Sequence, residues 1–201
     1  MNFQTISLAK VIRILIVTAL SIIIFIFITG LNRDYEPLIG YVDQVDQDKF
    51  SGEWYIVSNI PYFAEKGKVA SKAIYKRKGP NSFDDIFESK DGAFDKPIDR
   101  IVGKATSLNA ENTKWRSTFY WLISFEFEVL YVDEDYTTMV LGHQSRDYGW
   151  VMSRTKTVSQ DTINRAMSVF TKNGYDITKF ELVPQTPDQL HNTNIQLFQS
   201  I

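Results

Sequence analysis

The chain's clearest structural signal is the stretch FEFEVLYV, residues 125–132. Apolar and acidic side chains alternate at its start, and a period of two is typical of a β-strand with one buried face. The alternation divides the stretch into two faces, with Phe125, Phe127 and Val129 on one and Glu126, Glu128 and Leu130 on the other. We expect the apolar face to point into the protein. The alternative is that one of the two glutamates points into a polar pocket.

Short runs of the same kind lie on both sides of this stretch, separated by turn signals such as Gly-Pro-Asn at 79–81 and Asp-Gly at 91–92. They are rich in the β-branched and aromatic residues that strands favour. The predicted strands are residues 54–60, 71–76, 83–88, 100–107, 114–120, 125–132, 137–142 and 148–153. Strands do not alternate with helices, which argues against a doubly wound parallel sheet. The pattern predicts an all-β, eight-stranded antiparallel barrel, because closure leaves no unpaired edge.

One helix follows the strands. Ser159 is a suitable N-cap, and Gly174 stands where a glycine commonly ends a helix. The residues spaced to form one apolar helix face are Ile163, Met167 and Phe170. A short strand-like run at 180–183 comes next. The polar tail, residues 185–201, is expected to be unstructured.

A membrane segment is predicted near the N-terminus, where residues 14–31 (ILIVTALSIIIFIFITGL) carry no charge. About 20 apolar residues at roughly 1.5 Å each cross a hydrocarbon core of about 30 Å. We expect an uncleaved anchor over residues 1–30, because no paired small residues follow the run; a cleaved signal peptide is the alternative. Lys10 and Arg13 precede the run, which favours a cytoplasmic N-terminus and an exported C-terminal domain. Residues 31–42 are expected to be a tether.

Composition argues against several classes of function. Lys and Arg number 22 against 24 Asp and Glu, so a net charge of -2 gives no basic field for nucleic acid. Without cysteine there is no disulfide, thiolate metal site or cysteine nucleophile. His143 and His191 lack ligand spacing, and Gly92, Gly103 and Gly142 form no phosphate-binding loop. We therefore predict no metal, no cofactor and no catalytic residue, and do not expect an enzyme.

Four motifs occur in order along the predicted barrel: GEWY at 52–55, NIPYF at 59–63, DEDYT at 133–137 and RDYGWVMSRT at 146–155. Together they resemble the lipocalin family, and more narrowly the bacterial outer-membrane lipocalins related to apolipoprotein D. The resemblance covers residues 42–184. Its motif residues are Gly52, Trp54, Asp135, Tyr136, Arg146, Asp147, Tyr148 and Arg154.

The resemblance implies an up-and-down barrel of eight strands with a flanking C-terminal helix, whose interior is just wide enough for one small ligand. It also implies that Trp54 lies across the closed end with the Arg154 guanidinium packed on its face. Such a cation–π contact contributes about 0.5–2 kcal/mol. The chain departs from the family pattern twice: it has no cysteine for lipid attachment, and residues 119–122 (FYWL) lack a proline that relatives often have near the barrel mouth.

The barrel interior is the predicted binding site. Strand alternation puts Ile56, Ser58 and Ile60 on the same face as Trp54. We expect a ligand to meet the cavity or its mouth at Ile56, Ser58, Ile60, Phe63, Tyr120, Trp121, Phe125, Phe127, Val129 and Trp150. The alternatives are core packing for Trp150, loop packing or membrane contact for the rim aromatics, and a barrel filled by its own side chains.

The function implied by the resemblance is reversible binding of a small hydrophobic molecule, such as a fatty acid or a lysophospholipid, for lipid storage, transfer or envelope maintenance. The barrel is expected on the periplasmic side of a bacterial inner membrane, held by its N-terminal helix, or free in the periplasm or secreted if the segment is cleaved. One alternative is a structural module whose filled barrel docks a partner protein. Another is an enzyme acting on lipid or isoprenoid substrates through Glu126 and Glu128.

Overall fold

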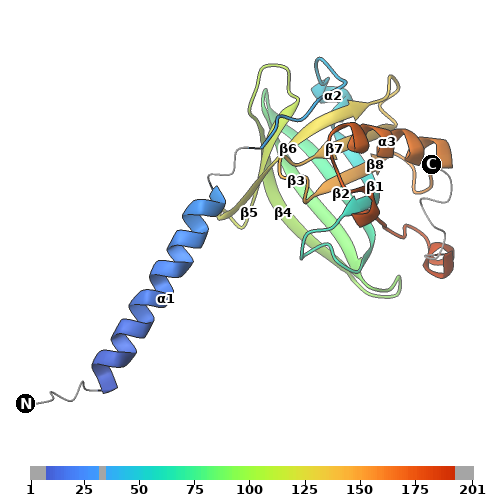
Figure 1. Ribbon diagram of the computed structural model, residues 1–201. Coiled ribbons are helices and arrows are strands. Elements are labelled where there is room, and N and C mark those ends of the chain that lie inside the picture. The colour runs from blue at the N-terminus through green and yellow to red at the C-terminus, as the bar shows by residue number, and fades with distance from the viewer. Residues whose placement is uncertain (1–7, 32–34, 193–201) are drawn as a thin grey trace, which may run out of the picture. The chain divides into compact units, whose positions relative to one another are not determined.

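The computed structural model describes residues 8–31 and 35–192, and the chain divides into two units between Glu36 and Pro37. The first unit contains the helix α1 (Leu8–Leu31) and the second contains a barrel (Figure 1). Among the residues searched, which are those that the structure describes, no helix is both long and apolar enough to span a membrane. The anchor predicted over residues 1–30 is therefore not confirmed, and the side chains of residues 22–31 lie outside the described part.

The second unit is built on one antiparallel sheet that closes on itself. Its strands are β1 (Gly52–Ile60), β2 (Lys68–Gly79), β3 (Ser82–Asp91), β4 (Ile98–Ser107), β5 (Lys114–Phe119), β6 (Ile123–Val132), β7 (Thr138–Gly142), β8 (Gly149–Ser153) and β9 (Glu181–Leu182). Each of β1 to β8 pairs with its neighbours in sequence, and β1 pairs with both β2 and β8, so the barrel has no open edge among these strands. The eight-stranded antiparallel barrel predicted from the sequence is confirmed, with shifted strand ends, most of all in β2. The ninth strand, β9, pairs with β1.

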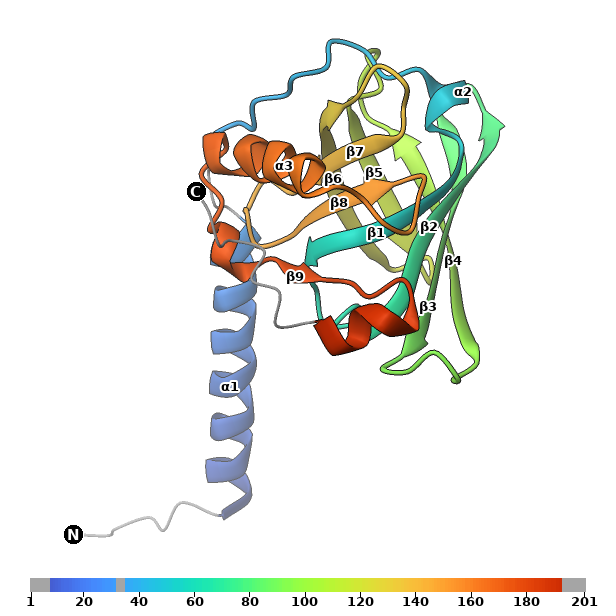
Figure 2. The ribbon, with the colours of Figure 1, turned by 90° about the vertical axis from the view of Figure 1, so that its right-hand side faces the viewer.

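Four helices complete the part of this unit that the structure describes: α2 (Gln47–Phe50), α3 (Gln160–Lys172), η1 (Ile177–Lys179) and η2 (Pro187–Asn192). The predicted C-terminal helix is confirmed as α3, whose first turn is capped where the Thr162 backbone N–H donates to Ser159 Oγ (3.2 Å). It lies against the outside of the barrel over β6 and β7 (Figure 2). Its buried face, Ile163, Ala166, Met167, Val169 and Phe170, packs with Leu130, Val140 and Val151.

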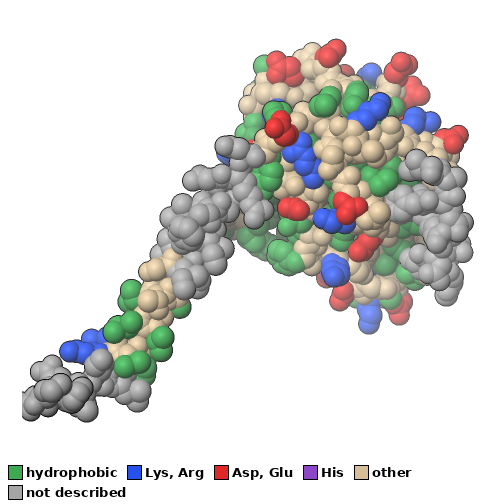
Figure 3. Space-filling model, viewed as in Figure 1, with side chains coloured by type: hydrophobic (Ala, Val, Ile, Leu, Met, Phe, Trp, Pro, Cys, Tyr) green, Lys and Arg blue, Asp and Glu red, His purple; other side chains and the backbone are tan. Residues whose placement is uncertain are grey.

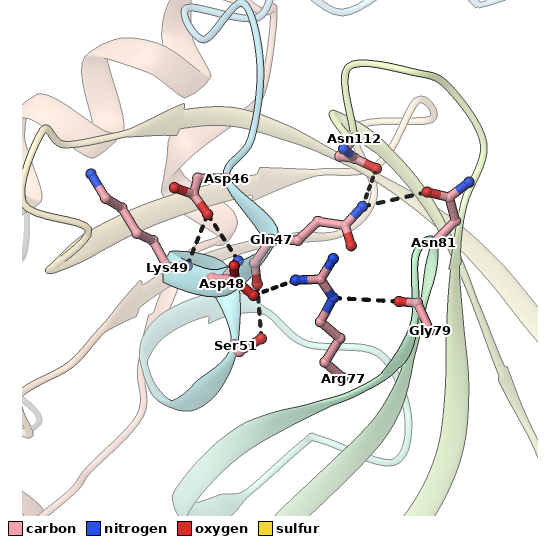
Figure 4. A network of polar contacts seen from close by, with 9 residues as sticks. All are labelled: Asp46, Gln47, Asp48, Lys49, Ser51, Arg77, Gly79, Asn81 and Asn112. Carbon is pink, nitrogen blue, oxygen red and sulfur yellow. Dashed lines mark hydrogen bonds and ion pairs between the residues drawn. The ribbon is translucent and has the colours of Figure 1, made fainter.

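The helix α2 caps one end of the barrel. Its N-cap is Asp46, whose Oδ1 accepts the backbone N–H groups of Asp48 (2.9 Å) and Lys49 (3.2 Å). Arg77 of β2 pairs with Asp48, and Gln47 Nε2 donates to Asn112 Oδ1 (2.7 Å), in the contact network of Figure 4. The last residue of α2, Phe50, is fully buried and stacks on Trp115 with ring centroids 5.4 Å apart. This helix was not predicted from the sequence, and it closes the barrel.

The closed end also carries the arrangement that the family resemblance implies. Trp54 is fully buried, and the guanidinium carbon of Arg154 lies 3.6 Å from the centroid of its ring. Arg154 Nη1 donates to the Glu53 carbonyl (2.6 Å) and Nη2 to the Ser51 carbonyl (2.9 Å). The indole N–H of Trp54 donates to the Phe50 carbonyl (2.8 Å). A planar cation suits this site because it stacks on one ring and donates to several carbonyls at once.

Residues 37–42, predicted as part of a tether, instead pack on the barrel unit. Leu38 is buried with the side chains around α3. The Ile39 backbone N–H donates to Asn173 Oδ1 (2.6 Å), and the Tyr41 N–H donates to the Leu130 carbonyl (2.7 Å). These bonds satisfy backbone groups in a segment whose sequence shows no strand or helix pattern, which is why sequence alone did not place it.

The start of the predicted unstructured tail is also ordered against the barrel. Gln185 is buried, and its Nε2 donates to the carbonyls of Ile56 (2.6 Å) and Ser71 (2.9 Å). The helix η2 follows it. These two bonds compensate the burial of the amide nitrogen, an arrangement that composition does not reveal. Residues 193–201 lie outside the described residues.

Candidate functional site

An open cup lies at the end of the barrel opposite α2. Its volume is about 410 Å³, within the range of roughly 300–1,000 Å³ usual for small-molecule sites. Its walls come from three loops at this end of the barrel and from β3, β4, β5, β6 and β8. The lining residues are Tyr62, Phe63, Ala64, Phe87, Ile101, Phe119, Tyr120, Ile123, Phe125, Tyr148 and Trp150. Every one of these side chains is aromatic or aliphatic, so the cup favours a ligand with an apolar body.

The turn between β5 and β6 forms part of the rim. Its two central residues, Tyr120 and Trp121, have positive φ angles of 50° and 55°. Two such residues suit a tight hairpin, but this region normally favours Gly and Asn over bulky side chains. Trp121 is 89% exposed, and Phe63 on the loop after β1 is also exposed. The rim therefore presents large apolar side chains to solvent beside the cup.

A smaller chamber of about 40 Å³ lies deeper in the barrel and shares five lining residues with the cup. The shared residues are Tyr62, Phe87, Phe119, Phe125 and Trp150. The residues that line the chamber alone are Ile56, Glu65, Ala73, Tyr75, Asp85, Phe127, Leu141 and Met152. Two carboxyl groups thus stand among apolar side chains, and no lysine, arginine or histidine belongs to this lining.

Glu65 is buried, with 7% of its surface exposed, and both of its carboxylate oxygens are engaged by the protein. Trp150 Nε1 donates to Oε1 (2.8 Å), while Asn59 Nδ2 (3.1 Å) and the Tyr62 backbone N–H (3.3 Å) donate to Oε2. Burial raises the pKa of Glu65 to about 7, although these hydrogen bonds lower it. The residue ties the loop after β1 to the barrel wall and orients the Trp150 indole.

Asp85 differs from Glu65 in its partners. Its side chain lies between those of Phe83 and Phe87 on the inner face of β3 and is 5% exposed. Ser117 Oγ donates to Asp85 Oδ2, and this is the single hydrogen bond to its carboxylate from the described part of the chain. Burial raises the pKa of Asp85 to about 6, with the serine bond acting in the opposite direction. When it is ionised, Asp85 therefore has one hydrogen bond from the described residues to offset its burial.

The two tyrosines of the chamber stay protonated. Burial is the first cause that raises the pKa of Tyr62 and of Tyr75, and the neighbouring Glu65 and Asp85 carboxylates raise both further. The phenol groups are therefore neutral donors and acceptors at physiological pH.

The structure brings most of the predicted cavity residues together. Ile56, Phe125, Phe127 and Trp150 line the chamber, and Phe63 and Tyr120 line the cup. Val129 points into the barrel but lies in the packed cluster outside both cavities. Trp121 belongs to neither lining and is exposed at the rim turn.

The prediction that Ser58 and Ile60 share the face of Trp54 is wrong. The pairing of β1 with β8 shifts register between Ile56 and Ser58, and such a bulge reverses the alternation beyond it. Ile60 consequently packs in the cluster under α3, and Ser58 Oγ donates to the Glu181 carbonyl of β9.

The alternative that a glutamate of β6 points into the interior is also wrong. Glu126 pairs with Arg116 (2.5 Å) and Glu128 with Lys114 (3.3 Å) across β5 and β6 on the outer face. Acidic and basic side chains are interspersed over the face of the barrel unit in Figure 3. The enzyme hypothesis thus loses its two named candidates.

The other motif residues, apart from Gly52 at the start of β1, lie in loops. Tyr136 Oη accepts the Asp46 backbone N–H (2.9 Å) near α2, and Asp135 lies beside it in the turn between β6 and β7. Arg146, in the turn between β7 and β8, donates from Nε to the Asn173 carbonyl (3.0 Å). The backbone N–H of Asp147 donates to a serine hydroxyl in the same turn, and Tyr148 lines the cup. Within residues 8–31 and 35–192, no group of His, Cys, Asp and Glu side chains is placed to hold a metal ion.

Comparison with known proteins agrees with this geometry. Residues 45–185 match the family model described as a lipocalin-like domain. The chain belongs to the lipocalin family. Outer membrane lipoprotein Blc of Escherichia coli (strain K12) is 25% identical to this lipocalin over 148 residues, covering 72% of this chain and 81% of Blc. Apolipoprotein D of Macaca fascicularis is 25% identical over 151 residues, covering 71% and 78%.

The fold has counterparts among solved structures. Insecticyanin from the tobacco hornworm Manduca sexta matches this lipocalin with a TM-score of 0.59 and 17% identity, over 77% of this chain and 88% of that one. At 17% identity, this similarity shows a shared fold and nothing more. The resemblance to bacterial lipocalins and apolipoprotein D that the sequence motifs indicated is confirmed by the relatives.

Sequence reasoning missed Glu65 and Asp85, the two acidic residues of the chamber. Glu65 lies in a loop, where no periodic pattern predicts whether a side chain points inward or outward. Asp85 had a signal: in SFDDIFES it shares parity with Phe83 and Phe87, so an alternation that puts the two phenylalanines inside also puts Asp85 inside.

Proposed function

We propose that this lipocalin binds a small, mainly apolar molecule at the open end of its barrel, reversibly and without covalent change. The observation that carries the proposal is the 410 Å³ cup with its aromatic and aliphatic walls. Membership of the lipocalin family supports it. The ligand's body would fill the cup, and its end would reach the chamber beneath.

Affinity in the micromolar range is expected. Burying an apolar chain of about 12 methylenes gains roughly 10 kcal/mol at about 0.8 kcal/mol each. Association costs on the order of 4–15 kcal/mol, so little of that gain remains unless polar contacts add to it.

A titration with the neutral fluorescent probe N-phenyl-1-naphthylamine tests the proposal. Ile101 lines the cup, whereas its neighbour Val102 on β4 is exposed on the outer face. Ile101→Trp should fill part of the cup and weaken probe binding at least tenfold, and Val102→Trp should leave it unchanged. Probe that dissolves in detergent gives the same background signal for both variants. The difference between the variants therefore measures probe binding in the cup. Equal binding by both variants would rule out the cup as the site.

The second candidate is a structural module that docks a partner protein. It is favoured by the packed cluster that fills the closed half of the barrel, where Phe50, Trp54 and Trp115 are fully buried. A melting temperature that no member of a lipid panel raises would support this candidate, because a ligand that binds only the folded state must stabilise it.

We also propose, as a separate point, that residues 14–31 hold the chain at a membrane on its exported side. The uncharged sequence of this run supports the proposal, and so does the outer-membrane designation of Blc. Intact mass of the chain purified from its own membrane fraction tests it. A full-length mass supports the anchor, and a mass lacking the first thirty or so residues would replace it with a cleaved signal.

A further inference from the structure

The chamber beneath the cup has a charge imbalance. Among its lining residues, Glu65 and Asp85 are acidic and none is basic. Glu65 is compensated, because three donors from the protein meet its two oxygens. Asp85 receives one hydroxyl bond from Ser117. An ionised carboxylate taken out of water is costly unless it is paired, so Asp85 is the group in this chamber that a ligand would stabilise most.

The chamber admits a small polar group. Its volume of about 40 Å³ is a few times the roughly 10–15 Å³ that one water needs. An ammonium group is close to a water in size, whereas the body attached to it would not fit. That body has the 410 Å³ cup directly above, since the cup and the chamber share five lining side chains.

The side chains that line both the cup and the chamber are all aromatic. Phe125 stacks with Phe119 and with Trp150, at centroid distances of 5.9 and 6.1 Å, and Tyr62 lies 6.1 Å from Phe125. Aromatic faces attract cations, with a larger gain where water is excluded. A carboxylate headgroup would meet neither attraction, because it would enter beside two acidic groups, and a neighbouring like charge is unfavourable.

We propose that the ligand is an amine: an apolar body in the cup whose ammonium group enters the chamber and pairs with Asp85. This inference rests on the proposed function and narrows it. It assigns Asp85 as the recognition group, Ser117 as the hydroxyl that orients its carboxylate, and Glu65 as a positioning residue for Trp150 and the loop after β1.

Three eight-carbon probes of equal length test the inference: octylamine, octanol and octanoate. Their dissociation constants are measured by calorimetry on the full chain at pH 7.5. Octylamine should bind at least tenfold more tightly than either of the others, as a charge-assisted hydrogen bond to a buried group predicts.

Two variants then test whether Asp85 causes the preference for octylamine. Asp85→Asn should weaken octylamine at least tenfold and change octanol by less than threefold. Asp84→Asn is the matched control, because Asp84 is the neighbour that faces outward and pairs with Lys78 (3.0 Å); it should leave octylamine unchanged. The comparison of the three probes on the unaltered chain stands even if Asp85→Asn fails to fold.

The outcomes separate the two claims. Octanol or octanoate binding as tightly as octylamine, or Asp85→Asn binding octylamine like the unaltered chain, would overturn the amine inference and leave the barrel as a binding site. If none of the three probes binds and N-phenyl-1-naphthylamine also fails, the proposed function falls, and the amine inference falls with it.

Discussion

Replacing Arg154 by methionine should destabilise the closed end of the barrel by about 3 kcal/mol. The substitution keeps an apolar stem and removes the guanidinium, which stacks 3.6 Å from the Trp54 ring centroid. That stacking contributes about 0.5–2 kcal/mol. The guanidinium also donates to the carbonyls of Glu53 (2.6 Å), Lys49 (2.5 Å) and Ser51 (2.9 Å). Each bond adds about 0.5–1.5 kcal/mol, and the partly exposed setting and shared donors keep the sum near 3 kcal/mol.

Urea unfolding monitored by circular dichroism measures this loss in the free energy of unfolding. In thermal unfolding of a domain of this size, a loss of about 3 kcal/mol corresponds to a fall in Tm of roughly 6–12 °C. The control is Arg116→Met, which removes a surface cation paired with Glu126 where both side chains are about half exposed. It should change the free energy of unfolding by less than about 1 kcal/mol. A loss of under 1 kcal/mol for Arg154→Met, or a loss equal to the control's, would refute the role assigned to this residue.

Three further predictions concern stability. Burial raises the pKa of Glu65 to about 7 from an ordinary 4.5, so its contribution to stability is complete below about pH 4.5 and lost as the pH rises through 7. The free energy of unfolding, measured at pH 4.5, 6 and 7.5, should therefore fall less steeply with pH in Glu65→Gln than in the unaltered chain. Parallel pH profiles for the two proteins would contradict this assignment. Gly142→Ala should lower the free energy of unfolding by about 1–3 kcal/mol, because an added Cβ would lie 2.6 Å from a buried leucine side chain. Gly79→Ala should be tolerated, because its Cβ would meet nothing nearer than 3.4 Å. Equal denaturation midpoints for the two variants would argue against tight packing under α3. Phe127→Ala should cost about 3–5 kcal/mol in thermal unfolding and the exposed Trp121→Ala less than about 0.5 kcal/mol, and the reverse order would be inconsistent with the packing.

Much of the barrel is predictable from the sequence because each strand carries its own alternation and turn residues. The stretch at 125–132 shows this well, since Phe125, Phe127 and Val129 all face inward in the structure. The contact between Trp54 and Arg154 joins residues far apart in the sequence, and here the family resemblance supplied what local patterns cannot.

The site is less predictable, for physical reasons. The run WYIVSNI suits either face at nearly every position, so nothing local marks the register shift after Ile56 that carries Ile60 to the outside. Burial of Glu65 depends on three donors that only the folded loop brings together. Gln185 is ordered by carbonyls of β1 and β2 that lie more than a hundred residues away in the chain.

The four tryptophans allow the most direct test that the open end of the barrel is the binding site. Trp150 lines both cavities, Trp121 stands on the rim, and Trp54 and Trp115 are buried at the closed end. In a ¹⁵N-labelled chain, each indole N–H gives its own signal in a heteronuclear NMR spectrum. Addition of N-phenyl-1-naphthylamine should shift the Trp150 signal in a saturable way and leave those of Trp54 and Trp115 in place. A Trp150 signal that does not move at saturating probe, or a larger shift at Trp54 or Trp115, would contradict the account.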